Sequence, residues 1–342
     1  MRPTFHPRLV NGPFEDPALF IPFFFEKRAL LFDLGDLHRL PPRDMLKITH
    51  AFVTHTHMDH FAGFDALLRI FLGRDRVLHV FGPPSFLRNV KGKLEGYTWN
   101  LVENYDDAFV LRATEVHPDH TLTQVFYCNR AFDSNQAPVK RDFDGALLKE
   151  SAFSVHAVHL DHKIPCLAFM LKERFHINIM KERLKPLNLP VGPWLRQLKE
   201  ALYEQRDPGE SLDVVWQENG QQREATFRLG DLSRQIARIS PGQKIVYIVD
   251  VISTLENIEK IIDFARNADQ LFIEAAFLDA DAHVARRKYH LTAKQAGRIA
   301  ALAQAKKMTP FHFSPRYTGD ACLLEAEARE SYNEVRNAPG QP

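Results

Sequence analysis

Short apolar runs separated by turns dominate the first quarter of the chain. Four of them, each four to eight residues long and rich in Leu, Ile, Val, Phe and Ala, predict buried strands at residues 18–25, 29–32, 47–53 and 77–81. Two other stretches space their apolar side chains at helical intervals, residues 61–72 and 85–94. Strands and helices that alternate at this spacing predict an α/β architecture of packed layers.

The same alternation returns in the last third of the chain. Before it, residues 107–128 and 151–172 are expected to form strands, joined by a polar connection over 129–150. The periodicity then weakens, and we interpret residues 173–243 as an insertion or arm that projects from a single domain spanning residues 1–342. Regular alternation resumes and predicts three strands and three helices: 244–249, 255–267, 270–275, 280–288, 292–305 and 308–313.

The composition is that of a globular protein. Its 342 residues, 45% apolar and 25% charged, can bury a substantial core. The net charge of +1 argues against a globally basic nucleic-acid binder and leaves room for a local basic patch. No apolar run approaches the roughly 20 residues that cross a bilayer, so we expect no membrane partner and a cytoplasmic location. Three scattered cysteines predict reduced thiols with no disulfide framework.

One loop concentrates metal-binding side chains. The string Thr54-His-Thr-His-Met-Asp-His60 places His55, His57, Asp59 and His60 within six positions, between the strand 47–53 and the helix 61–72. Side chains two residues apart in an extended segment point to one side, so His55 and His57 can reach the same ion. Asp59 and His60 follow at the next bend and are expected to face a second ion. A polar loop whose histidines cap backbone groups is the alternative, and the dinuclear centre explains more of the pattern.

This loop resembles the hallmark motif of the metallo-β-lactamase superfamily, which implies a four-layer αββα sandwich. The string Phe311-His-Phe-Ser-Pro-Arg-Tyr317 is similar to the last metal motif of the ribonuclease Z branch, and His290-Leu-Thr-Ala293 is similar to a segment of that branch. Two segments depart from the family pattern. Val249-Asp-Val251 replaces Gly-Asp-Thr, and Ile273-Glu-Ala-Ala276 replaces His-Glu-Ala-Thr, so we expect a divergent member.

The resemblance implies the rest of the metal ligands. His162 would complete the site of the first ion, His312 would complete that of the second, and Asp250 would bridge the two ions. His156 is the alternative to His162, because both lie in the string His156-Ala-Val-His-Leu-Asp-His162. Nitrogen and carboxylate donors favour zinc, while manganese and iron fit the same ligands.

The resemblance also implies the chemistry. A hydroxide bridging the two ions would attack a phosphodiester and cleave a tRNA precursor on its 3′ side, with Asp59 aiming the hydroxide. His290 would assist the leaving oxygen, and Glu274 would hold its imidazole. In the simpler alternative, Glu274 is the buried partner of a nearby base and His290 a helix N-terminal residue. Two other functions stay open: hydrolysis of a small ester at a dinuclear centre, and RNA binding without catalysis.

Substrate contacts are expected in the insertion. The segment Leu189-Pro-Val-Gly-Pro193 is similar to a Gly-Pro element in the arm with which ribonuclease Z clamps tRNA, so Gly192, Pro193 and the nearby Arg196 are candidate substrate-binding residues. Residues 172–206 carry eight Lys and Arg against four Glu. That excess suits a phosphate backbone or an ordinary solvated surface equally well. The family further implies a homodimer.

Two more polar positions have structural interpretations. Asp33 ends the strand 29–32, and we favour a turn carboxylate over a support for the metal loop. The string His117-Pro-Asp-His120 has metal-binding residue types but no partner cluster elsewhere in the chain. We therefore interpret it as a surface turn.

Overall fold

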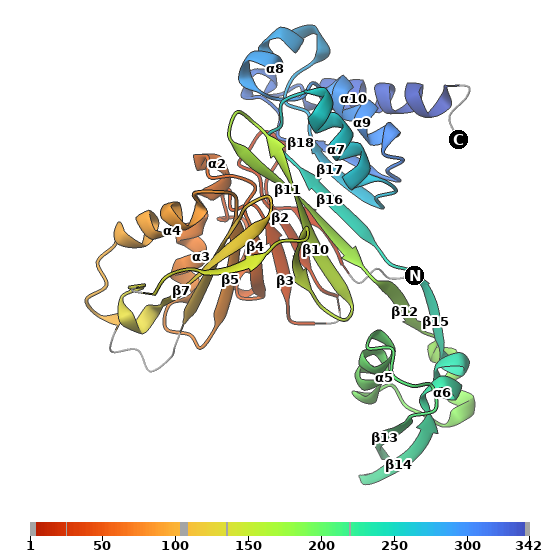
Figure 1. Cartoon of the computed structure of the whole chain (residues 1–342). Coiled ribbons are helices and arrows are strands. Elements are labelled where there is room, and N and C mark those ends of the chain that lie inside the picture. Colours follow the sequence, from red (N-terminus) through yellow and green to blue (C-terminus); the bar gives the residue numbers. More distant parts are fainter. Residues whose placement is uncertain (1–4, 25, 103–108, 135, 219, 339–342) are drawn as a thin grey trace. The chain divides into compact units, whose positions relative to one another are not determined.

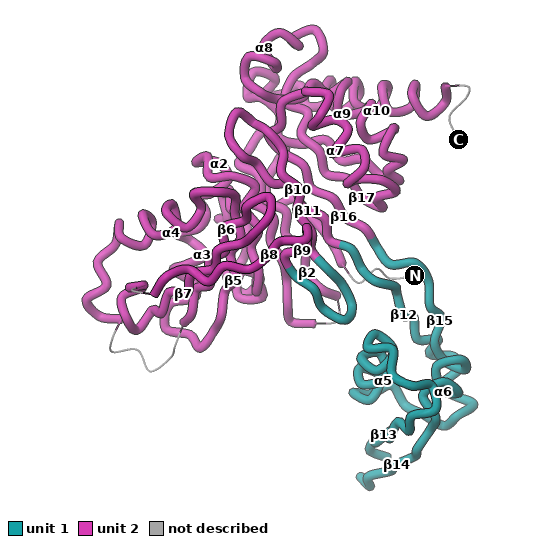
Figure 2. Tube along the Cα trace, viewed as in Figure 1, with its two compact units in different colours: residues 1–3, 148–154, 172–243 teal, residues 4–147, 155–171, 244–342 magenta. Residues whose placement is uncertain are grey.

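A computed structural model describes residues 5–24, 26–102, 109–134, 136–218 and 220–338. Residues 25, 107, 108, 135 and 219, which belong to predicted segments, lie outside this range. The described chain divides into two compact units (Figure 2): unit 1 holds residues 148–154 and 172–243, and unit 2 holds most of the remainder.

The first sheet of unit 2 contains eight strands in sequence order (Figure 1). Its four central strands run parallel, and the strands on either side are antiparallel. The strands are β1 (Arg8–Leu9), β2 (Leu19–Pro22), β3 (Ala29–Phe32), β4 (Ile48–Phe52), β5 (Val77–Gly82), β6 (Val110–Val116), β7 (His120–Tyr127) and β8 (Val139–Asp142). The apolar runs expected near the start of the chain thus form one sheet.

Four helices belong to the same half of unit 2: α1 (Pro42–Met45), α2 (Met58–Phe61), α3 (Phe64–Phe71) and α4 (Phe86–Glu95). In α3 the spacing of Phe64, Leu67, Leu68 and Phe71 makes one apolar face, and all four side chains are buried in a core shared with the sheet. Gly63 precedes α3 and lies against the backbone, where an added Cβ would come within 2.1 Å of the Gly35 carbonyl oxygen. A side chain at that position would displace the metal loop.

The second sheet contains six strands in the order β18-β17-β16-β11-β10-β9. Their bounds are β9 (Ala146–Lys149), β10 (Phe153–Asp161), β11 (Pro165–Glu173), β16 (Lys244–Ile248), β17 (Gln270–Glu274) and β18 (Met308–Phe311). Strands β16, β17 and β18 are parallel. Four helices accompany them: α7 (Leu255–Ala265), α8 (Ala282–Lys288), α9 (Ala293–Leu302) and α10 (Ala321–Asn337). The buried side chains of Ile261, Ile299 and Leu324 belong to the core that these helices form with the second sheet.

The two sheets pack face to face through aromatic rings. The ring of Phe169 on β11 lies 5.3 Å from that of Phe32 and 5.6 Å from that of Phe52, and Tyr247 on β16 lies 5.9 Å from Phe32. Helices cover the outer faces, with α3 and α4 on the first sheet and α7, α9 and α10 on the second (Figure 1). The predicted four-layer αββα arrangement is confirmed.

Unit 1 has a hydrophobic core of its own, which includes Trp194, Leu198, Val214, Leu232 and Ile236. Helices α5 (Trp194–Tyr203) and α6 (Leu229–Ile236) and the antiparallel pair β13 (Ser211–Glu218) and β14 (Gln221–Arg228) contribute to it. A second antiparallel pair in unit 1 consists of β12 (Phe175–Ile179) and β15 (Ala237–Pro241). In the part of the chain that the structure describes, no helix combines the length and apolar character needed to span a bilayer.

Candidate metal centre

The candidate ligands follow strands of both large sheets. The loop after β4 carries the histidine motif, while Asp250 follows β16 and His312 follows β18. Because β16 and β18 are both parallel to β17, Asp250 and His312 lie at the same edge of the second sheet although they are far apart in the sequence. His162 follows β10, whose chain turns back as β11, and Leu167 on β11 donates from its backbone N–H to the Thr54 carbonyl at 2.9 Å. All these residues belong to unit 2.

Three histidines and one carboxylate form the first group. His55 Nε2 lies 3.3 Å from Asp250 Oδ2 and 2.9 Å from His57 Nδ1, and His162 Nε2 lies 3.5 Å from the same Asp250 oxygen. The opposite nitrogen of His162, Nδ1, donates to the Tyr289 carbonyl at 2.8 Å. That bond fixes the ring so that Nε2 faces the group. One ligand atom from each residue lies within 4.8 Å of the others, which suits a single ion.

The second group consists of Asp59, His60 and His312. Asp59 Oδ2 lies 3.3 Å from His60 Nε2 and 3.4 Å from His312 Nε2. Asp250 faces this group as well, with Oδ2 3.4 Å from His60 Nε2 and Oδ1 3.0 Å from His312 Nδ1. One carboxylate therefore lies between two sets of histidines, as the predicted bridging role requires.

Orphaned polar atoms show that divalent ions fit this place. Among the described residues, the buried side-chain atoms without a hydrogen-bond partner include His60 Nε2, Asp250 Oδ1 and His312 Nδ1. Buried polar atoms ordinarily have a hydrogen-bond partner. These three atoms lie close together, and a bound ion that accepts their lone pairs would explain why they have none. Nitrogen and oxygen donors of this kind bind zinc and related divalent metals.

The turn at Asp250 is made without the family's glycine because Asp250 itself adopts a left-handed backbone, with φ of 51°. His312 does the same, with φ of 57°. Among residues with a Cβ, Asp, Asn and His tolerate this conformation best. The next residue, Val251, donates its N–H to Glu274 Oε1 at 2.7 Å.

Asp33 supports the metal loop, and the favoured interpretation as a turn carboxylate is wrong. The side chain is buried, and Oδ1 accepts from the Thr54 N–H at 2.7 Å while Oδ2 accepts from His60 Nδ1 at 2.9 Å and from the Tyr247 hydroxyl at 3.0 Å. Because His60 Nδ1 is held in this way, Nε2 points to the second group. Asp33 thus fixes both the loop and one candidate ligand.

His290 and Glu274 form a pair beside the two groups. His290 Nδ1 lies 2.8 Å from Glu274 Oε2 and 3.5 Å from Asp250 Oδ1. Glu274 ends β17 and is buried, whereas His290 precedes α9 and keeps part of its ring exposed. The structure therefore brings together the two residues that the sequence assigned to one catalytic pair. One ligand atom from each of Asp250, Glu274, His290 and His312 also lies within 4.8 Å of the others, so this set could hold an ion as well.

Burial and neighbouring charges set the protonation of the site. Burial and the nearby His60 lower the pKa of His55 to about 4, so its ring is neutral and free to bind a cation. Burial disfavours protonation of His290, but the Glu274 carboxylate outweighs it and raises the pKa of His290 to about 9. Burial also opposes ionisation of Asp250, yet His312 and His60 hold its pKa well below the ordinary value. A neutral His55 and an ionised Asp250 are the forms that bind metal.

Relatives of the chain decide its family. Ribonuclease Z of Deinococcus radiodurans is 31% identical over 318 residues, which cover 90% of this chain and 90% of that protein. The chain belongs to the ribonuclease Z family. Ribonuclease Z of Limosilactobacillus reuteri is 30% identical over 86% of this chain and 81% of its own length. The metallo-β-lactamase fold protein YhfI from Bacillus subtilis shares the fold, with a TM-score of 0.52, 14% identity, and coverage of 93% of this chain and 86% of that one. No family model matches the chain.

Other sequence candidates lie apart from these groups. His156 is in none of the groupings found among the described residues, and His159 donates from Nε2 to the Val116 carbonyl. His117 and His120 stack with their rings 4.3 Å apart at the β6–β7 turn, where they pair with Glu115 and Asp119. The structure thus supports a turn there.

The arm residues belong to unit 1. Gly192 lies against Trp194, where an added Cβ would approach the indole to 3.2 Å, and Pro193 immediately precedes helix α5. Arg196 is 79% exposed and pairs with Glu200 at 2.9 Å. Its guanidinium is accessible to an anion from solvent.

Three supporting residues escaped sequence reasoning. Asn89 on α4 donates to Thr56 Oγ1 at 2.6 Å, Tyr247 donates to Asp33, and Tyr289 accepts from His162. Only Tyr289 could have been suspected from the sequence, because it directly precedes the candidate residue His290. The family's metal motifs include the ligands but not these more distant contacts.

Proposed function

We propose that this ribonuclease Z relative is a metal-dependent hydrolase that cleaves tRNA precursors on the 3′ side. The observation that carries the proposal is Asp250, whose carboxylate faces two histidine groups while the His290–Glu274 pair lies 3.5 Å away. Family membership supplies the substrate class, since the relatives are named ribonuclease Z. A phosphodiester placed between the groups would meet both the metal ligands and a protonated imidazole.

The proposal includes two divalent ions. His55, His57 and His162 would hold one ion, Asp59, His60 and His312 would hold the other, and Asp250 would bridge them. Zinc fits these donors best, and manganese or iron fits them too. Two such ions, when bound, would activate water for attack at neutral pH and neutralise charge on the phosphate.

The chain's own residues would position the substrate and move the proton. Glu274 bonds Nδ1 of His290, so Nε2 is the ring nitrogen left to serve the substrate. A protonated His290 would donate from Nε2 to the leaving oxygen or stabilise the charged transition state. Asp59, which is only partly buried, would accept a hydrogen bond from the attacking water and aim it. Products with a 3′-hydroxyl and a 5′-phosphorylated trailer are expected.

We further propose that residues 173–243 act as a substrate arm within the single domain of residues 1–342. Gly192 and Pro193 would approach the RNA backbone, and Arg196 would bind a phosphate. The test is Arg196→Glu, which is expected to raise KM and leave kcat unchanged. Arg234→Glu is the matched control, because Arg234 is 75% exposed on the same unit and also pairs with a helical carboxylate neighbour. If both changes raised KM equally, the effect would come from the net charge of the arm and not from a specific contact of Arg196.

The experiment for the main proposal compares two substrates. Zinc-reconstituted protein is incubated with a tRNA precursor carrying a 3′ trailer and, separately, with a small chromogenic phosphodiester. We expect cleavage of the precursor at the trailer junction. Hydrolysis of the small diester without RNA cleavage would favour the small-ester hydrolase, and inactive protein that binds no metal after reconstitution would favour a silent RNA-binding protein. The same preparation, measured by light scattering, tests the proposed homodimer.

A further inference from the structure

Lys163 lies at the turn between β10 and β11, directly after the candidate ligand His162. Its side chain is exposed, and its ammonium has no ion-pair partner among the described residues. The Lys163 backbone N–H donates to Asp161 Oδ1 at 2.7 Å, and the His162 N–H donates to the Ile164 carbonyl at 3.0 Å. Two hydrogen bonds therefore hold the turn that presents this cation.

The ammonium of Lys163 lies over the face of an aromatic ring. Its Nζ is 5.2 Å from the centroid of the Tyr289 ring, so the β10–β11 turn approaches the end of α8 (Figure 1). A cation over an aromatic face is attracted by the negative charge of the π system. The contact restricts a long side chain that would otherwise occupy many rotamers. The position of the charge is therefore set before any substrate binds.

Tyr289 connects this charge to the candidate metal centre. Its carbonyl accepts from His162 Nδ1 at 2.8 Å, and its ring centroid lies 6.4 Å from that of His162. One aromatic ring thus separates the Lys163 ammonium from a candidate ligand of the first ion. If a phosphodiester is cleaved between the two histidine groups, a neighbouring phosphate of the same strand lies within reach of this side chain.

Both residues have a backbone conformation that lysine and tyrosine rarely adopt. The angle φ is 64° at Lys163 and 64° at Tyr289, in the left-handed region that glycine enters without a steric penalty. Strain of this kind is typically retained at functional sites. A lysine at a turn position where glycine would be less strained therefore favours a role for the side chain itself.

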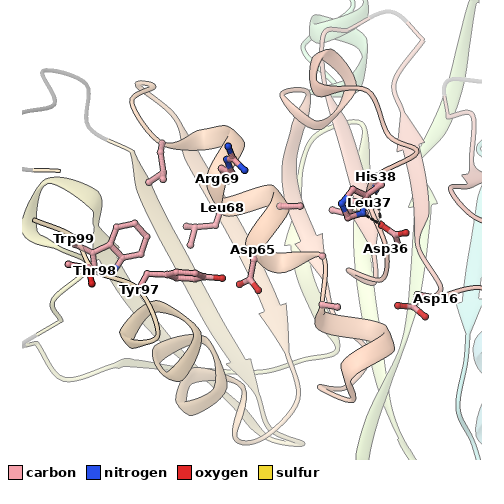
Figure 3. A pocket seen from close by; sticks show the side chains of 14 residues that line it. Asp16, Asp36, Leu37, His38, Asp65, Leu68, Arg69, Tyr97, Thr98 and Trp99 are labelled. Atoms are coloured by element: carbon pink, nitrogen blue, oxygen red, sulfur yellow. Dashed lines mark hydrogen bonds and ion pairs between the residues drawn. The ribbon is translucent and has the colours of Figure 1, made fainter. Parts of the chain in front are cut away.

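A cavity elsewhere in unit 2 offers phosphate no comparable partner. It has a volume of about 730 Å³ (Figure 3). Its lining includes three carboxylates and a single arginine: Asp16, Asp36, Asp65 and Arg69. Three carboxylates repel a phosphate. The exposed ammonium of Lys163 is therefore the better partner for an RNA backbone.

We propose that Lys163 binds a backbone phosphate of the RNA substrate next to the cleaved one, and that the Tyr289 ring positions its ammonium for this contact. The inference rests on the proposed function for its substrate class. A phosphate contact carries no sequence information, so it strengthens binding without selecting a base. Because the charge attracts substrate and transition state alike, it lowers KM and leaves kcat unaffected.

The first test removes the charge. Lys163→Gln is expected to raise KM for the precursor roughly three- to fivefold, as the loss of one exposed ion pair would, with kcat and metal content unchanged. The plot of log kcat/KM against log salt concentration should become shallower by roughly one unit of slope. Lys163→Arg keeps the charge and should restore most of the affinity.

Lys307→Gln is the matched control. Lys307 is also exposed and has no ion-pair partner among the described residues, but it precedes β18, whereas the candidate ligand His312 follows that strand. Its KM and salt slope should match those of the wild type. An equal loss in Lys307→Gln would assign the effect to net charge and overturn the proposed contact.

The second test locates the phosphate. Precursors are made with one uncharged methylphosphonate linkage at each of the phosphates that flank the cleaved bond. One of these linkages should raise KM in the wild-type enzyme as much as Lys163→Gln does, and it should add nothing further in that variant. If the loss from every linkage adds fully to the loss from the variant, Lys163 contacts none of these phosphates and the inference is overturned.

The third test concerns the ring under the ammonium. Tyr289→Leu removes the ring, whereas the carbonyl that holds His162 belongs to the backbone and remains. KM should rise, and the rise should not add to that of Lys163→Gln. Tyr289→Phe keeps the aromatic face and should restore KM. A lower melting temperature in Lys163→Gln with KM unchanged would instead assign the lysine a purely structural role.

A binding measurement separates this inference from the proposed function. If the wild-type enzyme cleaves the precursor but Lys163→Gln changes neither KM nor the salt slope, the contact is overturned and the proposed function stands. If no RNA is cleaved, the proposed function fails, and fluorescence anisotropy of a labelled precursor with zinc-reconstituted protein then decides the inference. Weaker binding by Lys163→Gln than by the wild type supports the contact, and equal binding overturns it as well.

Discussion

Glu274 links His290 to the turn that carries Asp250. One carboxylate oxygen lies 2.8 Å from His290 Nδ1, and the other accepts from the backbone N–H of Val251 at 2.7 Å. The side chain is fully buried, so both contacts are shielded from water. The imidazole proposed for catalysis and the carboxylate proposed to bridge the ions are therefore positioned by the same residue.

Replacing Glu274 by Gln removes the negative charge that holds a protonated His290. We expect kcat to fall roughly 10- to 100-fold, while His290→Ala lowers it roughly 100- to 10,000-fold. Metal content, measured by mass spectrometry, should stay at the wild-type value in both variants. If His290→Ala retained full turnover, its role as proton donor would be wrong; if it lost metal, His290 would be a ligand.

Asp33→Asn should weaken metal binding although Asp33 touches no ion. One carboxylate oxygen accepts from the Thr54 backbone and the other from His60 and Tyr247, whereas asparagine keeps only one acceptor oxygen and cannot serve both sides. We expect metal affinity to drop roughly 10- to 100-fold, as is usual for groups that orient a ligand. Asp36→Asn is the control, because Asp36 is exposed in the same turn. Unchanged affinity in a competition assay with a chelator would contradict the role of Asp33.

Metal removal should lower the melting temperature. Among the described residues, His60 Nε2, Asp250 Oδ1 and His312 Nδ1 are buried without a hydrogen-bond partner, so a bound ion stabilises the folded state and leaves the unfolded chain largely unaffected. At 100 times Kd this contribution is about 2.7 kcal/mol. Calorimetry of protein treated with a chelator should show the loss, and added zinc should restore it. His57→Ala should melt like the metal-free protein and respond little to zinc.

Acid should destabilise the fold through His50. Burial, His79 and Arg28 lower the pKa of His50 to about 3, below its ordinary value of 6.5. Above pH 6.5 the ring is neutral in both states and has no effect. As the pH falls from 6.5 toward 3, the unfolded chain takes up a proton that the folded chain resists, so stability is lost.

His50→Phe tests this, because the ring stacks on His79 at 4.6 Å and lies near Phe52. We expect the melting temperature of the variant to fall less between pH 7 and pH 4.5 than that of the wild type. Thermal scans over that range decide the matter. Parallel pH profiles for the two proteins would assign the acid sensitivity to other groups.

Strong local patterns were enough to predict most of the layered core. Strand β3, for example, has the predicted bounds, because four consecutive apolar residues are buried on both faces. The connection expected over residues 129–150 instead contains β8, whose side chains are all exposed, and β9, whose side chains are only partly buried. Edge strands of this kind are formed by pairing with a neighbour, which a local pattern does not reveal. Helix α10 was also missed, because only three of its side chains, Leu324, Ala328 and Ser331, are buried and they give a weak apolar pattern.

The candidate site divides in the same way. His55 and His57 are recognisable because they lie two residues apart in one loop, and Asp250 and His312 were inferred from the resemblance to family motifs. Asp33 was misjudged because its decisive partners, Thr54 and Tyr247, are 21 and 214 positions away in the sequence. Buried hydrogen bonds between residues this far apart produce no periodic pattern in the sequence. Supporting contacts of this kind arise only from the folded arrangement of distant segments.

The bond from Tyr247 to Asp33 crosses from one sheet to the other. Tyr247 belongs to β16, and Asp33 follows β3, so a single 3.0 Å contact joins the two halves of the sandwich directly behind His60. The alignment of the sheets is thereby transmitted to a metal ligand. A substitution buried between the sheets, far from any substrate, can therefore lower activity by rotating the His60 imidazole.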